Sequence, residues 1–397
     1  MVKIPPDYIR FNRNEVAGAF GDIGTDLPLL VGMIATTGMS GGAVLLMFGL
    51  LQMATGLLYG LPMPVQPLKA VAAIAITQKL SASVVYGGGI AIGAIMLLLT
   101  TTRLLNVLAA VTPKVVIRGV QFGLGLQLMS LALKEYIPRD GTPGVALAIV
   151  AFTFAFLLYQ NRRFPAALPL VAIGALYAAV FLRSGAGSEV ALTPVFPLSL
   201  ALPAASDIWT GLLVLALPQI PLSLSNSVLA TKQMVTDLFP ERRLTITKIG
   251  LTYSLMNLIA PLFGGVPVCH GSGGMAGHYT FGARTGGSVM LYGSIYLIIG
   301  LLLASGFTQV LNLFPFPILG VILSFEGIAL LRLFRDMTSE REWVIGLTVG
   351  LLAGIVAYGF LVGMAVGLAL YYLWPYGKGD ASITESAPSS EEEKDSA

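Results

Sequence analysis

The chain has 397 residues, of which 55% are apolar and only 11% are charged, and its formal net charge is +3. Its mean hydropathy of +0.82 lies outside the range of soluble domains, which excludes an ordinary soluble enzyme or binding module. We therefore predict an all-α polytopic membrane protein whose partner is the lipid bilayer, with no nucleic-acid partner.

The two ends of the chain differ from its middle. Residues 1–14 lack the apolar core and small-residue cleavage site of a signal peptide, and are expected to be a cytoplasmic segment. Residues 15–376 are predicted to form one transmembrane domain, and residues 377–397, which end in EEEKDSA, a disordered acidic tail. Arginine and lysine are concentrated in every second predicted loop, and loops rich in these residues are usually cytoplasmic. Both termini are therefore expected in the cytoplasm, and the protein in the cell (inner) membrane.

Fourteen apolar elements are predicted, in two sets of seven. The first set lies near residues 24–38, 43–59, 61–79, 84–101, 113–133, 143–159 and 164–182. A proline-rich loop over residues 183–207 follows, and the second set lies near 208–234, 246–263, 264–282, 286–305, 310–331, 342–357 and 358–374. Because seven is odd, the second half (208–374) runs opposite to the first (15–182), which predicts a 7+7 inverted repeat.

The third element of each set is interrupted by proline and glycine. The first break reads GLPMPVQPLKA (60–70) and the second GGVPVCHGSGG (264–274), and helix-prone runs, AVAAIAI and MAGHY, come directly after them. Irregular backbone at membrane depth is tolerated only where protein or a water-filled cavity satisfies its polar groups. The third and tenth elements are therefore predicted to be broken helices that flank a transporter's substrate site.

Both predicted helix starts suit an anion. Lys69 is expected one turn into the first helix, and Ser272 opens the second among three glycines, Gly271, Gly273 and Gly274. Each helix N-terminus carries roughly half a positive charge, so the two ends and Lys69 supply about +2, which matches a tetrahedral dianion. A neutral nucleobase would use carboxylates that face its ring N–H groups instead. The alternative for Lys69 is a side chain that snorkels to the membrane surface.

Four further polar residues lie in or near these segments. Gln66, in the first break, and Gln219, in PQIPLSLSNSV (218–228), are candidate substrate ligands, although such amides also join helices. His270 is a candidate for substrate contact and His278 for proton transfer, and each has the alternative of a structural hydrogen-bond donor. The two histidines have only Cys269 as a nearby potential ligand, so no metal site and no cofactor are predicted.

Three carboxylates are candidates for carrying a coupling proton. Asp22 and Asp26, in FGDIGTDLP, are four residues apart and share a helical face. The alternative is that Asp22 caps the helix and Asp26 lies in the membrane interface. Glu326 is isolated inside an apolar run, which favours a proton carrier or a protonated side chain satisfied by a neighbouring helix.

Several of these segments resemble a known family. FGDIGTDLP, PMPVQPLKAVAAIAI, VPVCHGSGGMAGHYTFGARTG and PQIPLSLSNSV are similar to segments of the molybdate transporter branch of the sulfate permease superfamily. The resemblance implies core and gate subdomains, an anion held between the third and tenth helices, and a homodimer with elevator-like movement. Two features depart from it: only a short tail stands where sulfate permeases carry a cytoplasmic regulatory domain, and Asp26 stands where the branch more often has an uncharged residue.

The residues and the resemblance together predict a secondary active transporter of a tetrahedral oxyanion, with molybdate as the first choice. Alternating access with proton coupling is expected, and sodium is the alternative coupling ion. A sulfate or tungstate transporter, a nucleobase/proton symporter and an anion channel remain alternatives. An enzyme is disfavoured, because the sequence offers only the two histidines with serines nearby as a reactive group.

Overall fold

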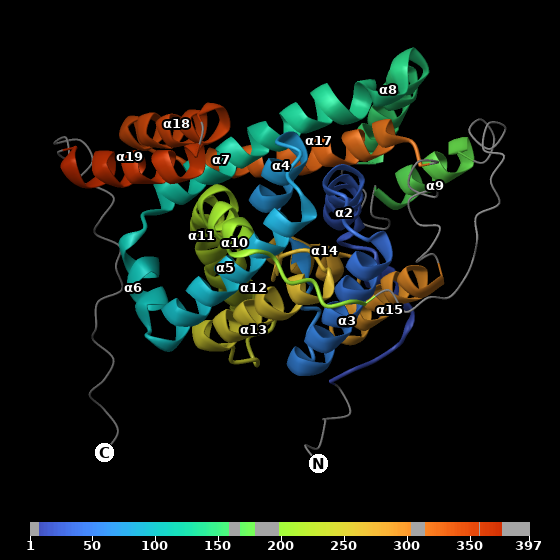
Figure 1. Ribbon diagram of the computed structural model, residues 1–397, viewed down its shortest axis with the longest axis horizontal. Helices are drawn as coiled ribbons and strands as arrows, with labels where there is room; N and C mark the ends of the chain where they lie inside the picture. Colours follow the sequence, from blue (N-terminus) through green and yellow to red (C-terminus); the bar gives the residue numbers. More distant parts are fainter. Residues whose placement is uncertain (1–7, 159–166, 179–197, 303–313, 357, 375–397) are drawn as a thin grey trace.

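The computed structural model describes residues 8–158, 167–178, 198–302, 314–356 and 358–374, and this part of the chain is mostly helical (Figure 1). Six of its helical stretches are long and apolar enough to cross a membrane, and α1 with α2, bent by 42°, would make a seventh. The predicted acidic tail and residues 183–197 of the predicted loop lie outside the described residues.

The first half contains nine helices and one short strand within the described residues. They are α1 (Arg13–Ala19), α2 (Ile23–Thr37), α3 (Gly41–Tyr59), β1 (Gln66–Pro67), α4 (Lys69–Thr77), α5 (Ala82–Thr101), α6 (Leu104–Val111), α7 (Lys114–Leu131), α8 (Gly141–Leu158) and α9 (Ala167–Tyr177). A π-helical turn, η1 (Ala132–Tyr136), and a 3-10 turn, η2 (Ile137–Asp140), join α7 to α8. The prediction missed α6, which lies between its fourth and fifth elements.

The second half has a similar order. Its elements are α10 (Ala205–Gly211), η5 (Leu212–Ala216), α11 (Leu217–Leu222), η6 (Ser223–Leu229), α12 (Ala230–Leu238), α13 (Ile246–Ile259), η7 (Pro261–Phe263), β2 (Val268–Cys269), α14 (Ser272–Thr280), α15 (Gly287–Leu302), α17 (Phe316–Arg332), η8 (Leu333–Asp336), α18 (Glu340–Ile355) and α19 (Gly359–Leu373). Residues 205–238 form one continuous helical path in which η5 and η6 are π-helical. Proline and polar side chains in this path, as in PQIPLSLSNS, fit such local rearrangements of helical hydrogen bonding.

The helices fall into two groups (Figure 1). The long-helix layer consists of α7, α8, α9, α17, α18 and α19, and in it α7 packs on α17 and α18. The half-helix bundle consists of α1 to α5 and α10 to α15, and in it α3 packs on α15 and α5 packs on α13. The half-helices α4 and α14 lie inside this bundle, and α2 and α4 face the long-helix layer.

Two very short strands hold the predicted breaks together. β1 pairs antiparallel with β2, with Gln66 opposite Cys269 and Pro67 opposite Val268. Lys69 is the first residue of α4, so its predicted position one turn into the helix is wrong. The reason is that the residues just before it are extended and paired with β2. The predicted start of the second half-helix at Ser272 is confirmed.

A buried amide side chain supports each extended segment. Gln52 of α3 donates to the carbonyl oxygen of Val65 (2.8 Å) and accepts from its N–H (3.0 Å). Asn257 of α13 does the same for Val268, at 2.6 and 2.9 Å. Both amides are fully buried. Backbone groups that the breaks leave out of a helix are satisfied in this way inside the protein.

Glycines allow α3 and α15 to approach closely. A Cβ atom added to Gly49 would lie 2.5 Å from the carbonyl oxygen of Gly293, and one added to Gly56 would lie 2.7 Å from that of Gly286. These distances are well below van der Waals contact, so only glycine fits at this crossing. Small residues at helix crossings are a common means of packing in membranes, where lipid and protein side chains are equally apolar.

We predict that Gly49→Ala lowers stability. The added methyl group must displace the α15 backbone, and overpacking of this kind costs about 1–3 kcal/mol. Gly354→Ala in α18 is the matched control, because its Cβ would have neighbours no closer than 3.7 Å. Alanine there should be neutral or stabilising by up to about 1 kcal/mol. Thermal unfolding of both variants in detergent measures this, and equal melting temperatures would contradict close packing at Gly49.

Candidate functional site

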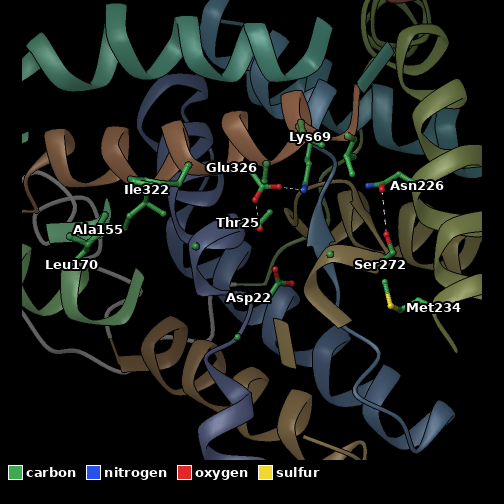
Figure 2. Close-up of a pocket in the computed structure, with 17 residues that line it drawn as sticks. Asp22, Thr25, Lys69, Ala155, Leu170, Asn226, Met234, Ser272, Ile322 and Glu326 are labelled. Atoms are coloured by element: carbon green, nitrogen blue, oxygen red, sulfur yellow. Dashed lines mark hydrogen bonds and ion pairs between the residues drawn. The ribbon is translucent and has the colours of Figure 1, made fainter. Parts of the chain in front are cut away.

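A cavity of about 480 Å³ lies between the half-helix bundle and the long-helix layer. Its polar wall is formed by Asp22, Thr25, Lys69, Asn226, Ser272 and Glu326, and Gly273 also lines it. Its apolar wall is formed by Ala155, Leu170, Met234, Ile322, Phe325, Ala329, Leu330 and Leu333. Figure 2 shows the polar side chains arriving from α2, α4, η6, α14 and α17.

An ion pair crosses this cavity. The Lys69 ammonium group contacts the Glu326 carboxylate, and the two side chains are only 9% and 18% exposed. Thr25 of α2 donates a hydrogen bond to the other carboxylate oxygen of Glu326, at 3.3 Å. All three side chains point toward one another (Figure 2). Lys69 therefore lies in the interior of the protein and does not reach a membrane surface.

The N-terminus of α14 opens on the cavity. Its N-cap residue is Gly271, which has no side chain to cap the helix, and the amides of a helix's first turn have no intrahelical partner. Nothing lies within 4 Å of a Cβ atom added to Gly273, so a ligand can approach the backbone there. The Ser272 hydroxyl lies 3.4 Å from the amide oxygen of Asn226. These groups are suited to bind an anion.

The N-terminus of α4 has different surroundings. The side-chain oxygen of Gln219 accepts from the amides of Ala70 (3.1 Å) and Val71 (3.4 Å), and its nitrogen donates to Ser223 (3.2 Å). Gln219 is buried and does not line the cavity. The first half-helix therefore presents the Lys69 side chain to the cavity, while the amides of Ala70 and Val71 donate to Gln219.

Asp22 lies beside the start of α14. Its carboxylate accepts a hydrogen bond from Gln66 at 2.5 Å, and its other oxygen lies where a side chain at Gly274 would point. Asp22 occupies the N-cap position of α2 without capping it. Asp26, one turn further on, is fully buried. Both carboxylates thus lie in the protein interior.

The two histidines lie behind the cavity. His270 is fully buried, and its ring nitrogens lie 2.8 Å from the Thr252 hydroxyl and 3.3 Å from the carbonyl oxygen of Pro64. His278 is fully buried and packs edge-on against the Tyr292 ring. Cys269 is free and buried. Among the described residues, no cluster of histidine, cysteine and carboxylate has the arrangement of a metal site.

The structure brings five of the predicted site residues together around one cavity, namely Asp22, Lys69, Ser272, Gly273 and Glu326. The others, Asp26, Gln66, Gln219, His270, Gly271, Gly274 and His278, surround these residues without lining it. Sequence reasoning missed the contribution of Thr25, and among the polar residues of PQIPLSLSNSV it preferred Gln219 to Asn226 as the residue that lines the cavity. Both belong to quoted motifs, FGDIGTDLP and PQIPLSLSNSV, and polar residues inside apolar helices are the signal that points to them.

Comparison with solved structures identifies the fold of the chain. Its fold is similar to the transmembrane domain of the cyanobacterial bicarbonate transporter BicA (TM-score 0.66, 16% identity, 89% of this chain and 98% of that one). It is also similar to SLC26A9 (TM-score 0.69, 14% identity, 91% of this chain and 64% of that one). The chain therefore has the helical membrane fold that these two proteins share, with six or seven apolar spans among the described residues.

Sequence comparison identifies the family. Residues 14–128 and 211–330 match the family described as "Molybdate transporter of MFS superfamily". Molybdate transporter 2 of Arabidopsis thaliana is 33% identical over 87% of this chain and 85% of its own length, and Molybdate transporter 1 of the same plant is 31% identical over 95% and 92%. The chain belongs to the molybdate transporter family, which confirms the predicted resemblance. These relatives are named as transporters and not as enzymes.

We predict that Gln219→Met destabilises the protein. Methionine preserves the length of the side chain but leaves two buried amides of α4 without an acceptor, and loss of a helix cap costs about 0.5–2 kcal/mol. Gln233→Met, on an exposed part of α12, is the control. Thermal unfolding should show a lower midpoint for the first variant only. Equal midpoints would mean that the Gln219 side chain does not stabilise α4.

Proposed function

We propose that the protein is a secondary active transporter of a tetrahedral oxyanion, with molybdate as the substrate. The observation that carries this proposal is that the Lys69 ammonium group and the uncapped start of α14 line the same cavity. A fixed cation and the free amides of a helix N-terminus both favour an anion, and in the protein interior they act in a medium of low dielectric constant. The names of the Arabidopsis relatives support molybdate as the particular anion.

A nucleobase is the second candidate substrate. The carboxylates of Asp22 and Glu326 and the amide of Asn226 line the cavity, and such groups could accept or donate to ring N–H and carbonyl groups. The family relationship favours the oxyanion. Sulfate and tungstate have the shape and charge of molybdate, and discrimination by size in a preformed site is worth only about 1–3 kcal/mol.

Contacts between helices support an inverted repeat of seven plus seven elements. Each of the seven predicted elements of the first half corresponds, in such a repeat, to the element at the same place in the second half. α3 then corresponds to α13, and α5 to α15. The packed pair α3–α15 therefore has the packed pair α13–α5 as its counterpart. In the same way α2–α4 becomes α12–α14, and α7–α18 becomes α17–α8. The amide supports Gln52 and Asn257 lie on α3 and α13, which also correspond.

We assign the half-helix bundle to the core and the long-helix layer to the gate. Alternating access by an elevator-like movement of the core, in a homodimer, is what the family resemblance implies, and the cavity between the two groups suits it. Cytoplasmic termini and a position in the cell (inner) membrane complete the proposal, with residues 15–376 as the transport domain.

The binding experiment uses purified protein and a matched pair of variants. The parent should bind molybdate, tungstate or sulfate in preference to uracil. Gly273→Val should abolish binding while the protein stays folded, because its side chain enters open space in the cavity. Ser272→Ala should cost only about 0.5–1.5 kcal/mol, since it removes one neutral hydroxyl.

Two results would contradict this proposal. Preferential binding of uracil would assign the cavity to nucleobases. A folded Gly273→Val protein that binds molybdate as the parent does would show that the anion does not bind at the start of α14. Counterflow in proteoliposomes adds the test for a carrier, because a channel does not accumulate labelled anion against its gradient.

Coupling to cations follows from the charges of the site. Asp22, Asp26 and Glu326 are three buried or half-buried carboxylates, against the single ammonium group of Lys69. If all were ionised, a dianion would enter a region that is already negative, so protonation or a bound cation must accompany it. Asp22 and Glu326, which line the cavity, are the proposed proton carriers, and Asp26 and His278 are further candidates behind it.

We predict that uptake requires at least two co-transported cations per dianion. Import against an inside-negative potential costs about 2.3 kcal/mol per charge per 100 mV, and two protons or sodium ions would cancel this cost. Uptake into proteoliposomes should rise when the outside is made acidic, or when a sodium gradient is imposed. Uptake that responds to neither gradient would replace this account with facilitated exchange.

A further inference from the structure

Glu326 connects the two groups of helices. It lies on α17 in the long-helix layer, and its two carboxylate oxygens contact Lys69 of α4 and Thr25 of α2 in the half-helix bundle. The contact with Lys69 is an ion pair between side chains that are mostly withdrawn from solvent. The interface between core and gate thus contains a charge-assisted link inside the cavity.

The partner of Glu326 is also the principal cation of the proposed anion site. Among the residues that line the cavity, Lys69 is the only one with a positively charged side chain. A carboxylate and an oxyanion offer the same chemistry to an ammonium group, namely negatively charged oxygen acceptors. The Glu326 carboxylate therefore contacts the same ammonium group that an incoming oxyanion would contact.

The surroundings of Glu326 allow its side chain to move away from Lys69. Its side chain faces the cavity and is 18% exposed, and a cavity of about 480 Å³ is open beside it. A second carboxyl group, that of Asp22, also lines the cavity, and that of Asp26 of α2 is buried behind it. A dianion bound at Lys69 would repel the Glu326 carboxylate from it.

We propose that Glu326 is a built-in competitor of the substrate, which holds Lys69 in the empty transporter and is displaced when an oxyanion binds. Displacement breaks the link between α17 and α4, so oxyanion binding removes one contact between the core and the gate. This inference rests on the proposed function, since it takes an oxyanion as the ligand of Lys69.

The test is the affinity of Glu326→Gln for molybdate, by titration of purified protein. Glutamine has nearly the same shape and cannot form the ion pair, so Lys69 is left unpaired in the interior and available to the anion. The dissociation constant should fall by about tenfold or more. Glu340→Gln, an exposed carboxylate at the start of α18, is the control and should bind as the parent does.

The possible outcomes separate this inference from the proposed function. A parent that binds molybdate and a Glu326→Gln variant that binds it equally or more weakly would overturn the competitor role and leave the oxyanion site in place. A parent that binds no oxyanion would overturn the proposed function itself.

A second measurement keeps the inference testable if Glu326→Gln does not fold. Infrared difference spectra of the parent, recorded on adding molybdate, should show a change in carboxylate stretching bands as a carboxylate leaves its ammonium partner. Labelling of glutamate with ¹³C assigns the band to that residue type. A residue with a merely structural role would keep its partner, and the spectrum would show no glutamate change.

Discussion

The fold around the cavity depends on one constraint, which is that backbone interrupted at membrane depth must find its hydrogen bonds inside the protein. Four extended residues, paired as β1 and β2, meet part of this requirement, and the side chains of Gln52 and Asn257 meet more of it. Because the strands pair with each other, the half-helices that follow them start next to one another. The same arrangement that satisfies the backbone therefore creates the site.

The two half-helices contribute to the site in different ways. Gln219 already bonds the first amides of α4, so that helix presents a side-chain cation, whereas α14 presents its backbone. An anion between them, as we propose, would contact the Lys69 ammonium group on one side and the backbone amides of α14 on the other. The ammonium side is linked to the long-helix layer through Glu326, so the sensitivity of the gate to the ligand would arise there.

The sequence predicted the helix start at Ser272 and five of the residues that line the cavity, because proline, glycine and isolated charges are conspicuous in apolar sequence. It did not predict the Lys69–Glu326 ion pair, whose members are 257 residues apart in the chain, since no local pattern reports contacts of this kind. The start of α4 was misplaced because two residues are too few to show the alternation of a strand. The roles of Gln52 and Asn257 could not be predicted either, because the sequence does not show which backbone segments their side chains contact.

The most direct measurement is the position of the bound anion in an experimental structure of the protein with tungstate, whose electron-rich metal is easily located. The oxyanion should lie in the cavity, with its oxygens near the Lys69 ammonium group and the amides at Ser272 and Gly273, and with Glu326 withdrawn from Lys69. An anion bound elsewhere, with the Lys69–Glu326 pair intact, would contradict this account of the site.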